Sequence, residues 1–159
     1  MPVTILCVGK LRERFYADAV AEYHKRICRL MPLVIEEVAD EREPESSAEA
    51  LRVMALRKEG ERILPRIGQK DYVIAMCVDA KQPTSEELAG KVKALLVQGK
   101  SNITFVLGGS FGLSLQVLAR ADERISMSSM TFPHQLARVM LIEQLYRSAK
   151  ILAGETYHK

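Results

Sequence analysis

Cysteine is scarce in this sequence of 159 residues, and its three cysteines are widely spaced. Cys7, Cys28 and Cys77 form no CxxC pair, and their number is odd. A disulfide framework or a structural zinc site needs regularly spaced pairs, so this pattern argues against both. We therefore expect no bound metal, and we expect the protein to work in a reducing, cytoplasmic environment.

Long apolar segments are also missing. No run approaches the ~18 residues that a membrane-spanning helix needs. The apolar run at residues 3–8 is too short for the core of a signal peptide, and no basic segment precedes it. The chain has no internal repeat, low-complexity tract or linker. We therefore expect no membrane association and a single domain over residues 1–159, since a chain of this length buries roughly 70% of its unfolded surface.

The net charge is only +3, with 48% hydrophobic and 27% charged residues, a composition that excludes general disorder. Its distribution is uneven. Residues 1–30 carry six Lys or Arg against three Asp or Glu, whereas residues 36–49 carry seven acids and one Arg. A basic first helix is compatible with nucleic-acid contact, although a solvated helix face is the commoner reason for such a pattern.

Short apolar runs alternate with segments of helical periodicity. Strands are predicted at residues 3–8, 33–38, 72–78 and 103–107, with a brief one near 124–126. Helices are predicted at residues 16–30, 49–64, 85–95, 115–119 and 133–152. Such alternation predicts an α/β fold with a mostly parallel sheet flanked by helices. Ligands of such sheets bind at the carboxyl ends of the strands, here after Val78, Leu107 and Ser126.

Two helix starts carry a specific signal. Residues 46–49 (Ser-Ser-Ala-Glu) and 84–87 (Thr-Ser-Glu-Glu) both have the spacing of a capping box. In this motif a hydroxyl and a carboxylate satisfy the free N–H groups of the first helical turn. Pro133 suits the first turn of the last helix.

The last predicted helix has apolar residues on all its sides, from Leu136 to Leu152. One face of a sheet covers only one stripe of a helix, so a second partner is required. That partner is either a second copy of the chain, related by a two-fold axis, or further elements of the same chain. The pattern alone favours neither.

A glycine loop, Gly108-Gly109-Ser110-Phe111-Gly112, directly follows the predicted fourth strand. It fits the G-x-S-x-G elbow of serine hydrolases, with Asp122 or Glu123 and then His134 or His158 in the matching chain order. The short helix that follows makes this interpretation weak. The loop has neither the lysine of a phosphate-binding loop nor the G-x-G-x-x-G spacing. It is therefore either a plain turn or a loop whose backbone approaches a flat ligand such as adenosine.

Two further stretches are unusual. Residues 126–134 carry two Met, a Phe and a His in a loop, so they either line an apolar cleft or fold onto the core. The chain ends Tyr157-His158-Lys159, which offers a ring to stack on a base, an imidazole and an ammonium group. A frayed end is the alternative for this tail.

Taken together, these segments resemble the RlmH family of bacterial SPOUT-class methyltransferases. The similarity is carried by residues 105–113, 131–136, 143–147 and 157–159, and residues 5–11 match as well. It covers essentially the full chain. The resemblance implies a SPOUT-type fold with a C-terminal trefoil knot, although general connection rules treat knots as rare exceptions.

The resemblance also implies an activity. Members use S-adenosyl-L-methionine to methylate N3 of a pseudouridine in 23S ribosomal RNA, the large-subunit RNA, and they act on the assembled ribosome as homodimers. A serine hydrolase built on Ser110 and a non-catalytic ribosome-binding module are the alternative functions.

By position, the resemblance implies a set of cofactor-binding residues, which are Met76, Gly108, Met127, Ser128, Ser129, Met130, Thr131 and Phe132. Met76 stands where members often carry Leu, a change that conserves volume. Phe111 stands where a small or polar residue is common.

The reaction implied by the resemblance needs an imide nitrogen to lose its proton beside a positioned methyl donor. Arg147, Tyr157 and His158 are the catalytic candidates, and Lys159 is the candidate for contact with the RNA substrate. His158 has the most suitable unperturbed pKa, roughly 6.5.

Overall fold

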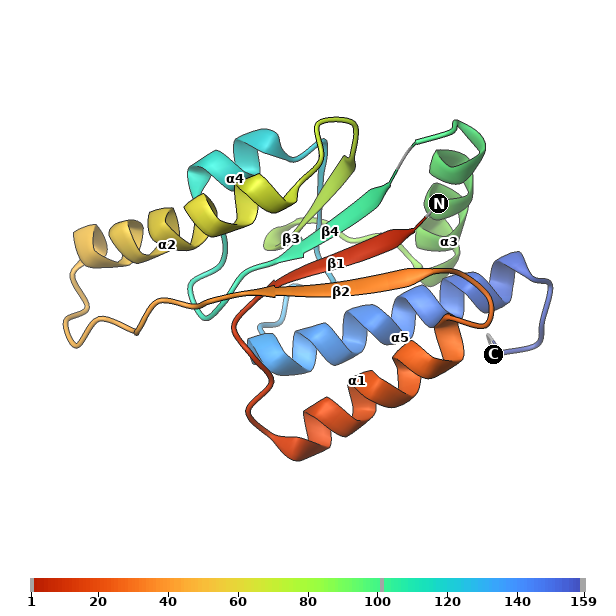
Figure 1. The fold of residues 1–159 in the computed structure, drawn as a ribbon, viewed down its shortest axis with the longest axis horizontal. Coiled ribbons are helices and arrows are strands. Elements are labelled where there is room, and N and C mark those ends of the chain that lie inside the picture. The colour runs from red at the N-terminus through yellow and green to blue at the C-terminus, as the bar shows by residue number, and fades with distance from the viewer. Residues whose placement is uncertain (1, 101, 158–159) are drawn as a thin grey trace.

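The computed structural model describes residues 2–100 and 102–157. Its centre is a five-stranded sheet of order β2-β1-β4-β3-β5 in which every pair of neighbours is parallel (Figure 1). The strands are β1 (Val3–Val8), β2 (Leu33–Val38), β3 (Tyr72–Lys81), β4 (Ile103–Leu107) and β5 (Glu123–Ile125). The helices are α1 (Arg14–Ile27), α2 (Glu49–Ile63), α3 (Ser85–Val97), α4 (Leu115–Arg120) and α5 (His134–Leu152), with a short 3₁₀ turn η1 (Leu64–Arg66) after α2.

Helices cover both faces of the sheet. Helix α5 packs between α1 and α3 on one face, and α2 and α4 cover the other (Figure 1). Along β1, Val3, Ile5 and Cys7 belong to the core under α5, whereas Leu6 and Val8 belong to the core under α2 and α4. Burial on both faces explains why β1 is a continuous apolar run rather than an alternating one.

Most of the predicted elements are confirmed. Strands β1, β2 and β4 have the predicted bounds, but β3 runs on to Lys81. Met76 and Lys81 both pair with Ile125 of β5, so residues 77–80 bulge out between them. The bulge is half-exposed and carries the polar Asp79, which ended the apolar signal too early.

One of the two capping boxes is confirmed and the other is wrong. The Thr84 hydroxyl accepts the Glu87 N–H at 3.1 Å, and the Glu87 carboxylate accepts the Thr84 N–H at 2.8 Å. Helix α2 instead begins after Ala48 with no side-chain cap. The Ser46 hydroxyl accepts the Ala48 N–H at 3.2 Å, so a local turn has taken the group that the box required.

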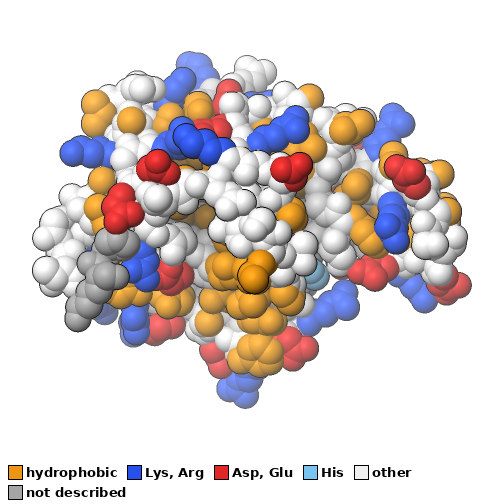
Figure 2. Space-filling model, turned by 180° about the vertical axis from the view of Figure 1, so that it is seen from behind, with side chains coloured by type: hydrophobic (Ala, Val, Ile, Leu, Met, Phe, Trp, Pro, Cys, Tyr) orange, Lys and Arg blue, Asp and Glu red, His pale blue; other side chains and the backbone are white. Residues whose placement is uncertain are grey.

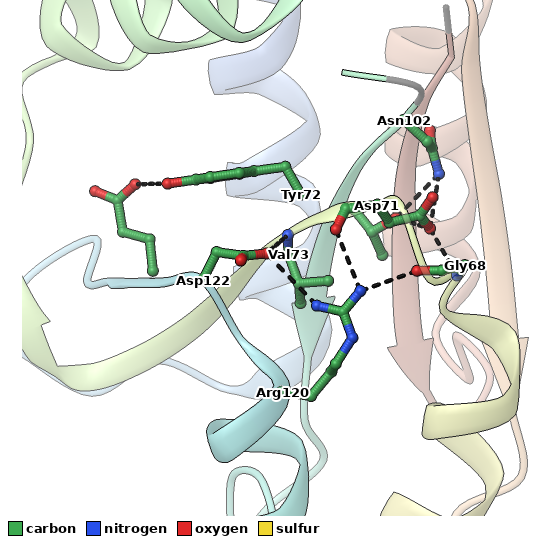
Figure 3. A network of polar contacts seen from close by, with 9 residues as sticks. Gly68, Asp71, Tyr72, Val73, Asn102, Arg120 and Asp122 are labelled. Carbon is green, nitrogen blue, oxygen red and sulfur yellow. Dashed lines mark hydrogen bonds and ion pairs between the residues drawn. The ribbon is translucent and has the colours of Figure 1, made fainter.

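A polar network closes the amino ends of the strands (Figure 3). The Asp71 carboxylate accepts hydrogen bonds from the Gly68 N–H, the Asn102 amide and the Thr104 hydroxyl at 2.9, 3.3 and 3.1 Å. Arg120 donates to the carbonyl oxygens of Gly68 and Asp71 at 2.9 and 3.2 Å. These bonds tie α4 to the start of β3, so the opposite, carboxyl edge is the one left open for a ligand.

The sequence left open whether elements of the same chain or a second copy cover the apolar sides of α5, and the structure answers part of this question. Its fully buried side chains face the sheet, α1 and α3 of the same chain. Leu136, Met140 and Ile151 are half-exposed and lie outside both core clusters. Elements of the same chain therefore cover most of α5 but leave one stripe without a partner. Pro133 precedes the helix as its N-cap instead of lying in its first turn.

Two further expectations bear on the fold. Among the described residues, no helix is long and apolar enough to cross a membrane. The trefoil knot implied by the resemblance stays a prediction, because strand order and pairing do not define how the chain is threaded.

Candidate functional site

An open cavity of ≈ 670 Å³ lies at the carboxyl ends of β3, β4 and β5. Three segments build it: the β3 bulge, the glycine loop after β4 and the loop after β5. Of the predicted cofactor-binding residues, those in its lining are Met76, Gly108, Met127, Ser128, Met130, Thr131 and Phe132, whereas Ser129 is not in it. The volume is in the range typical of small-molecule sites.

The glycine loop is tight, not floppy. A Cβ atom on Gly108 would lie 2.0 Å from the Gly112 carbonyl oxygen, so only glycine fits there. Gly112 has a φ of 87°, and its N–H donates to the Gly109 carbonyl at 3.2 Å. The loop thus folds back on itself and presents its backbone to the cavity, which is the form expected for close approach to a flat ligand.

Serine hydroxyls hold the loop after β5 in shape. The buried Ser126 hydroxyl donates to the Ser128 carbonyl at 2.8 Å and accepts the Ser128 N–H at 3.2 Å. The Ser128 hydroxyl accepts the Met130 N–H at 3.0 Å. Met127 packs against the core, whereas Met130 and Phe132 are exposed at the cavity mouth. Both alternatives considered from the sequence therefore hold: Met127 packs against the core, and most of the stretch, Met127 included, lines the cleft.

Among the described residues, those proposed for a serine hydrolase are not all brought together, and His158 lies outside the described residues. Ser110 and His134 line the same cavity at the carboxyl edge. Asp122 accepts the Val73 N–H at 2.8 Å, at the amino end of β3 (Figure 3), and Glu123 pairs with Lys91 at 2.7 Å. Because both acids lie toward the other end of the sheet, neither orients His134 toward Ser110. Burial, aided by the charge of Arg138, also lowers the pKa of His134.

A second cluster lies at the far end of α5. Arg147 pairs with Glu143 at 2.5 Å, and the Tyr157 hydroxyl donates to the same Glu143 oxygen at 3.3 Å. The Arg147 guanidinium lies 4.9 Å from the centre of the Tyr157 ring, which also meets the Tyr146 ring edge-on at 4.8 Å. The hydrogen bond to Glu143 raises the pKa of Arg147, and burial, followed by the charge of Glu143, raises the pKa of Tyr157.

The chain turns back at Gly154 to reach this cluster. Gly154 has a φ of 71°, and the N–H groups of Gly154 and Glu155 donate to the carbonyls of Ile151 and Lys150 at 3.1 and 3.0 Å. This is the Schellman pattern of a helix end. Tyr157 is therefore packed against α5, and the frayed-end alternative is wrong for this residue. His158 and Lys159, the other tail candidates, lie outside the described residues.

The cavity and the C-terminal cluster are separated within one chain. His134 opens α5 and lines the cavity, and Arg147 comes thirteen residues later on the same helix. At about 1.5 Å per residue, the two lie about 20 Å apart along the helix axis. The candidate catalytic residues Arg147 and Tyr157 therefore do not reach the cavity of their own chain in this structure.

The fold and the cavity define an α/β protein with an open cavity at the carboxyl edge of a parallel sheet. A family model described as "Predicted SPOUT methyltransferase" matches residues 1–158. The chain belongs to this family, and it has the SPOUT methyltransferase fold.

Several relatives have similar sequences over their whole length. The ribosomal RNA large subunit methyltransferase H of Bifidobacterium adolescentis is 50% identical over 159 residues, all of both chains. The protein of the same name from Clostridium novyi is 49% identical, again over all of both chains. A solved structure from Legionella pneumophila, titled as a methyltransferase in complex with SAM, is only 9% identical. The superposition covers 91% of this chain and 65% of the Legionella chain, with a TM-score of 0.47. This similarity is too distant to bear on the site.

Proposed function

We propose that this protein uses S-adenosyl-L-methionine to methylate N3 of a pseudouridine in large-subunit (23S) ribosomal RNA. The observation that carries the proposal is the cavity at the glycine loop, which gathers segments from three strand ends. Membership of the methyltransferase family and the names of the full-length relatives support it. We further propose that residues 1–159 act as one domain, in the cytoplasm, on the assembled ribosome.

The residues that line the cavity suit this cofactor. The loop at Gly108 offers backbone groups without side-chain bulk, which fits a flat adenine held through main-chain atoms. Met76, Met127 and Phe132 supply apolar walls, and the Ser128 segment supplies polar groups. When bound, the cofactor supplies an activated methyl group, so the chain mainly has to hold the donor and the RNA base in line.

Calorimetric titration with S-adenosyl-L-methionine tests the cofactor, and transfer of labelled methyl groups to ribosomes tests the reaction. Saturable binding together with transfer supports the proposal. Absence of binding at millimolar cofactor contradicts it. Tight binding to ribosomes with no transfer favours the ribosome-binding module instead.

We propose that the protein acts as a homodimer through the uncovered stripe of α5. Leu136, Met140, Glu143, Arg147 and Ile151 recur at steps of three and four residues, so they lie on one side of the helix. Figure 2 shows hydrophobic side chains gathered on the lower part of the opposite face of the molecule, where α1 and α5 run in Figure 1. A second copy packed across a two-fold axis would cover this stripe.

The dimer would also complete the active site. Arg147 lies on the same stripe as Leu136 and Met140, while its own cavity is about 20 Å away along the helix. An antiparallel pairing of α5 helices brings the C-terminal cluster of each chain toward the cavity of its partner. We therefore propose that the tail acts in trans, with Arg147 and Tyr157 orienting the RNA base, His158 taking its proton and Lys159 meeting phosphate.

A further inference from the structure

A second cavity of ≈ 390 Å³ adjoins the first. The two share part of their lining, namely Gly109, Ser110, Phe111 and His134. The rest of the second cavity comes from the end of β1 and the residues after it, from the residues after β2, from α2 and from Gln135 of α5. A ligand in this cavity would therefore lie against the same glycine loop as the methyl donor.

Glu59 of α2 is the most buried charged group of this cavity, with only 8% of its surface exposed. One carboxylate oxygen accepts the Glu41 N–H at 3.0 Å. The other has no hydrogen-bond partner in the part of the chain that the structure describes. Burial, followed by the charge of Asp40, raises the pKa of Glu59. Because no buried side-chain oxygen among the described residues lacks a hydrogen-bond partner, this second oxygen is accessible from the cavity and can accept a hydrogen bond from a ligand there.

The wall and rim of the cavity are aromatic and basic, in contrast to the acidic Glu59 inside it. The Phe111 side chain is 38% exposed, with the Arg52 guanidinium 5.0 Å from its ring centre. Lys10 and Arg12, both exposed, stand at the rim on the connection after β1. Arg12 is held by Asp40 at 3.4 Å, whereas Lys10 has no ion-pair partner among residues 2–100 and 102–157.

This combination fits a nucleotide better than a metal ion or a simple anion. An imide base offers N–H donors to a buried carboxylate, a flat face to an aromatic ring and a phosphate to a rim lysine. Among the described residues, no group of His, Cys, Asp and Glu has the arrangement of a metal site. An anion inside the cavity would be repelled by Glu59, Asp40 and Glu41, so the phosphate of a bound nucleotide would stay outside, beside Lys10.

We propose that this second cavity holds the target nucleotide, with Glu59 accepting an N–H of its base and Lys10 meeting its phosphate. The inference rests on the proposed function and adds the substrate side of the same site. Because the base and the methyl donor would share the glycine loop as a common wall, one loop fixes both partners of the transfer.

The test is Glu59→Gln, with Glu61→Gln on the exposed side of the same helix as the matched control. Glutamine keeps the shape and a carbonyl oxygen for the Glu41 N–H, so a purely structural role predicts no change. Loss of a charged acceptor to the base predicts that kcat/KM for ribosomes falls at least about tenfold. The Kd for S-adenosyl-L-methionine and the melting temperature should stay at their wild-type values.

Each other outcome overturns the proposal. Unchanged kcat/KM in Glu59→Gln would show that the carboxylate does not meet the substrate. If Glu59→Gln loses both cofactor binding and turnover, the role of Glu59 is to hold the cofactor cavity in shape and not to contact the substrate. If wild type and Glu61→Gln themselves transfer no methyl, the proposed function fails and this inference with it. If the wild type is active and Glu59→Gln is equally active, only this inference fails and the proposed function stands.

Lys10→Ala supplies a second, independent variant in case Glu59→Gln does not fold. Its side chain is exposed, so the fold should be unaffected, and Lys25→Ala on the exposed face of α1 is the control. We expect a higher KM for ribosomes and a shallower salt dependence in Lys10→Ala alone. If the KM of Lys10→Ala for ribosomes and its dependence on salt concentration equal those of Lys25→Ala, the proposal is overturned.

Discussion

Deleting Tyr157-His158-Lys159 should abolish methyl transfer while leaving cofactor binding intact. The cofactor cavity lies at the other end of α5, about 20 Å from Arg147 along the helix, so its shape should not depend on the tail. The loss of stability can be worked out from Tyr157. Its edge-on contact with Tyr146 is worth about 0.5–1.5 kcal/mol. The Arg147 guanidinium over its ring adds about 0.5–1 kcal/mol.

The free energy of unfolding should therefore fall by about 1–2.5 kcal/mol, which lowers the melting temperature by about 2–10 °C for a chain of this size. Calorimetry gives both the melting temperature and the cofactor affinity, and labelled methyl transfer to ribosomes gives turnover. Tyr157→Phe is the control for packing, because it keeps the ring contacts and removes only the hydroxyl. Wild-type turnover by the truncated chain would refute the catalytic role of the tail, and loss of cofactor affinity would refute the separation of the two sites.

Mixing the truncated chain with a full-length chain that cannot bind cofactor tests whether the tail acts in trans. Gly108→Val serves as that second chain. A heterodimer of the two contains one intact cavity and one intact tail on different chains. Recovered transfer would support a shared active site. No recovery, with heterodimers confirmed by mass, would mean that each chain uses its own tail.

Three further variants have defined outcomes. Gly108→Val should abolish cofactor binding, because the new side chain collides with the Gly112 carbonyl and displaces the loop. Gly90→Ala is the control: it has open space around it and should bind the cofactor normally in the same titration. Met140→Glu should yield monomers of 17.8 kDa in sedimentation, because it charges the uncovered stripe of α5; an unchanged dimer would contradict that interface. Arg138→Met should cost about 2–4 kcal/mol in urea unfolding, since the buried guanidinium binds Glu37 at 2.6 Å and the Gly9 carbonyl at 2.9 Å; a loss below about 1 kcal/mol would contradict this.

The sequence was a reliable guide wherever a local pattern had only one physical solution. The nearly continuous apolar runs of β1 and β4 predicted their bounds, because a strand buried on both faces has few polar positions. The bounds of the edge strand β2 were also correct, although it carries Glu36 and Glu37. The Thr84 capping box was correct for the same reason, since its donors and acceptors lie within one turn. The family resemblance also pointed to the strand ends that form the cavity.

Predictions failed where a local group had two possible partners. The Ser46 hydroxyl could cap a helix or close a turn, and it closes the turn. The polar residues after Val78 could end a strand or bulge from it, and their pairing with β5 makes them a bulge. Spacing alone decides neither choice: the Ser46 hydroxyl has two local donors within reach, and the bulge depends on pairing with β5, which is distant in the sequence.

By itself the sequence determined the class of fold and the order of its elements, and it left the glycine loop as either a plain turn or a place for a ligand. Only the tertiary structure decided that Gly108 faces the Gly112 carbonyl, that Glu59 from α2 lies beside the glycine loop, and that the tail cluster stands away from the cavity of its own chain. These are contacts between residues far apart along the chain. Chain order and hydrophobic period carry no record of them, because they arise only when the strands take the order β2-β1-β4-β3-β5.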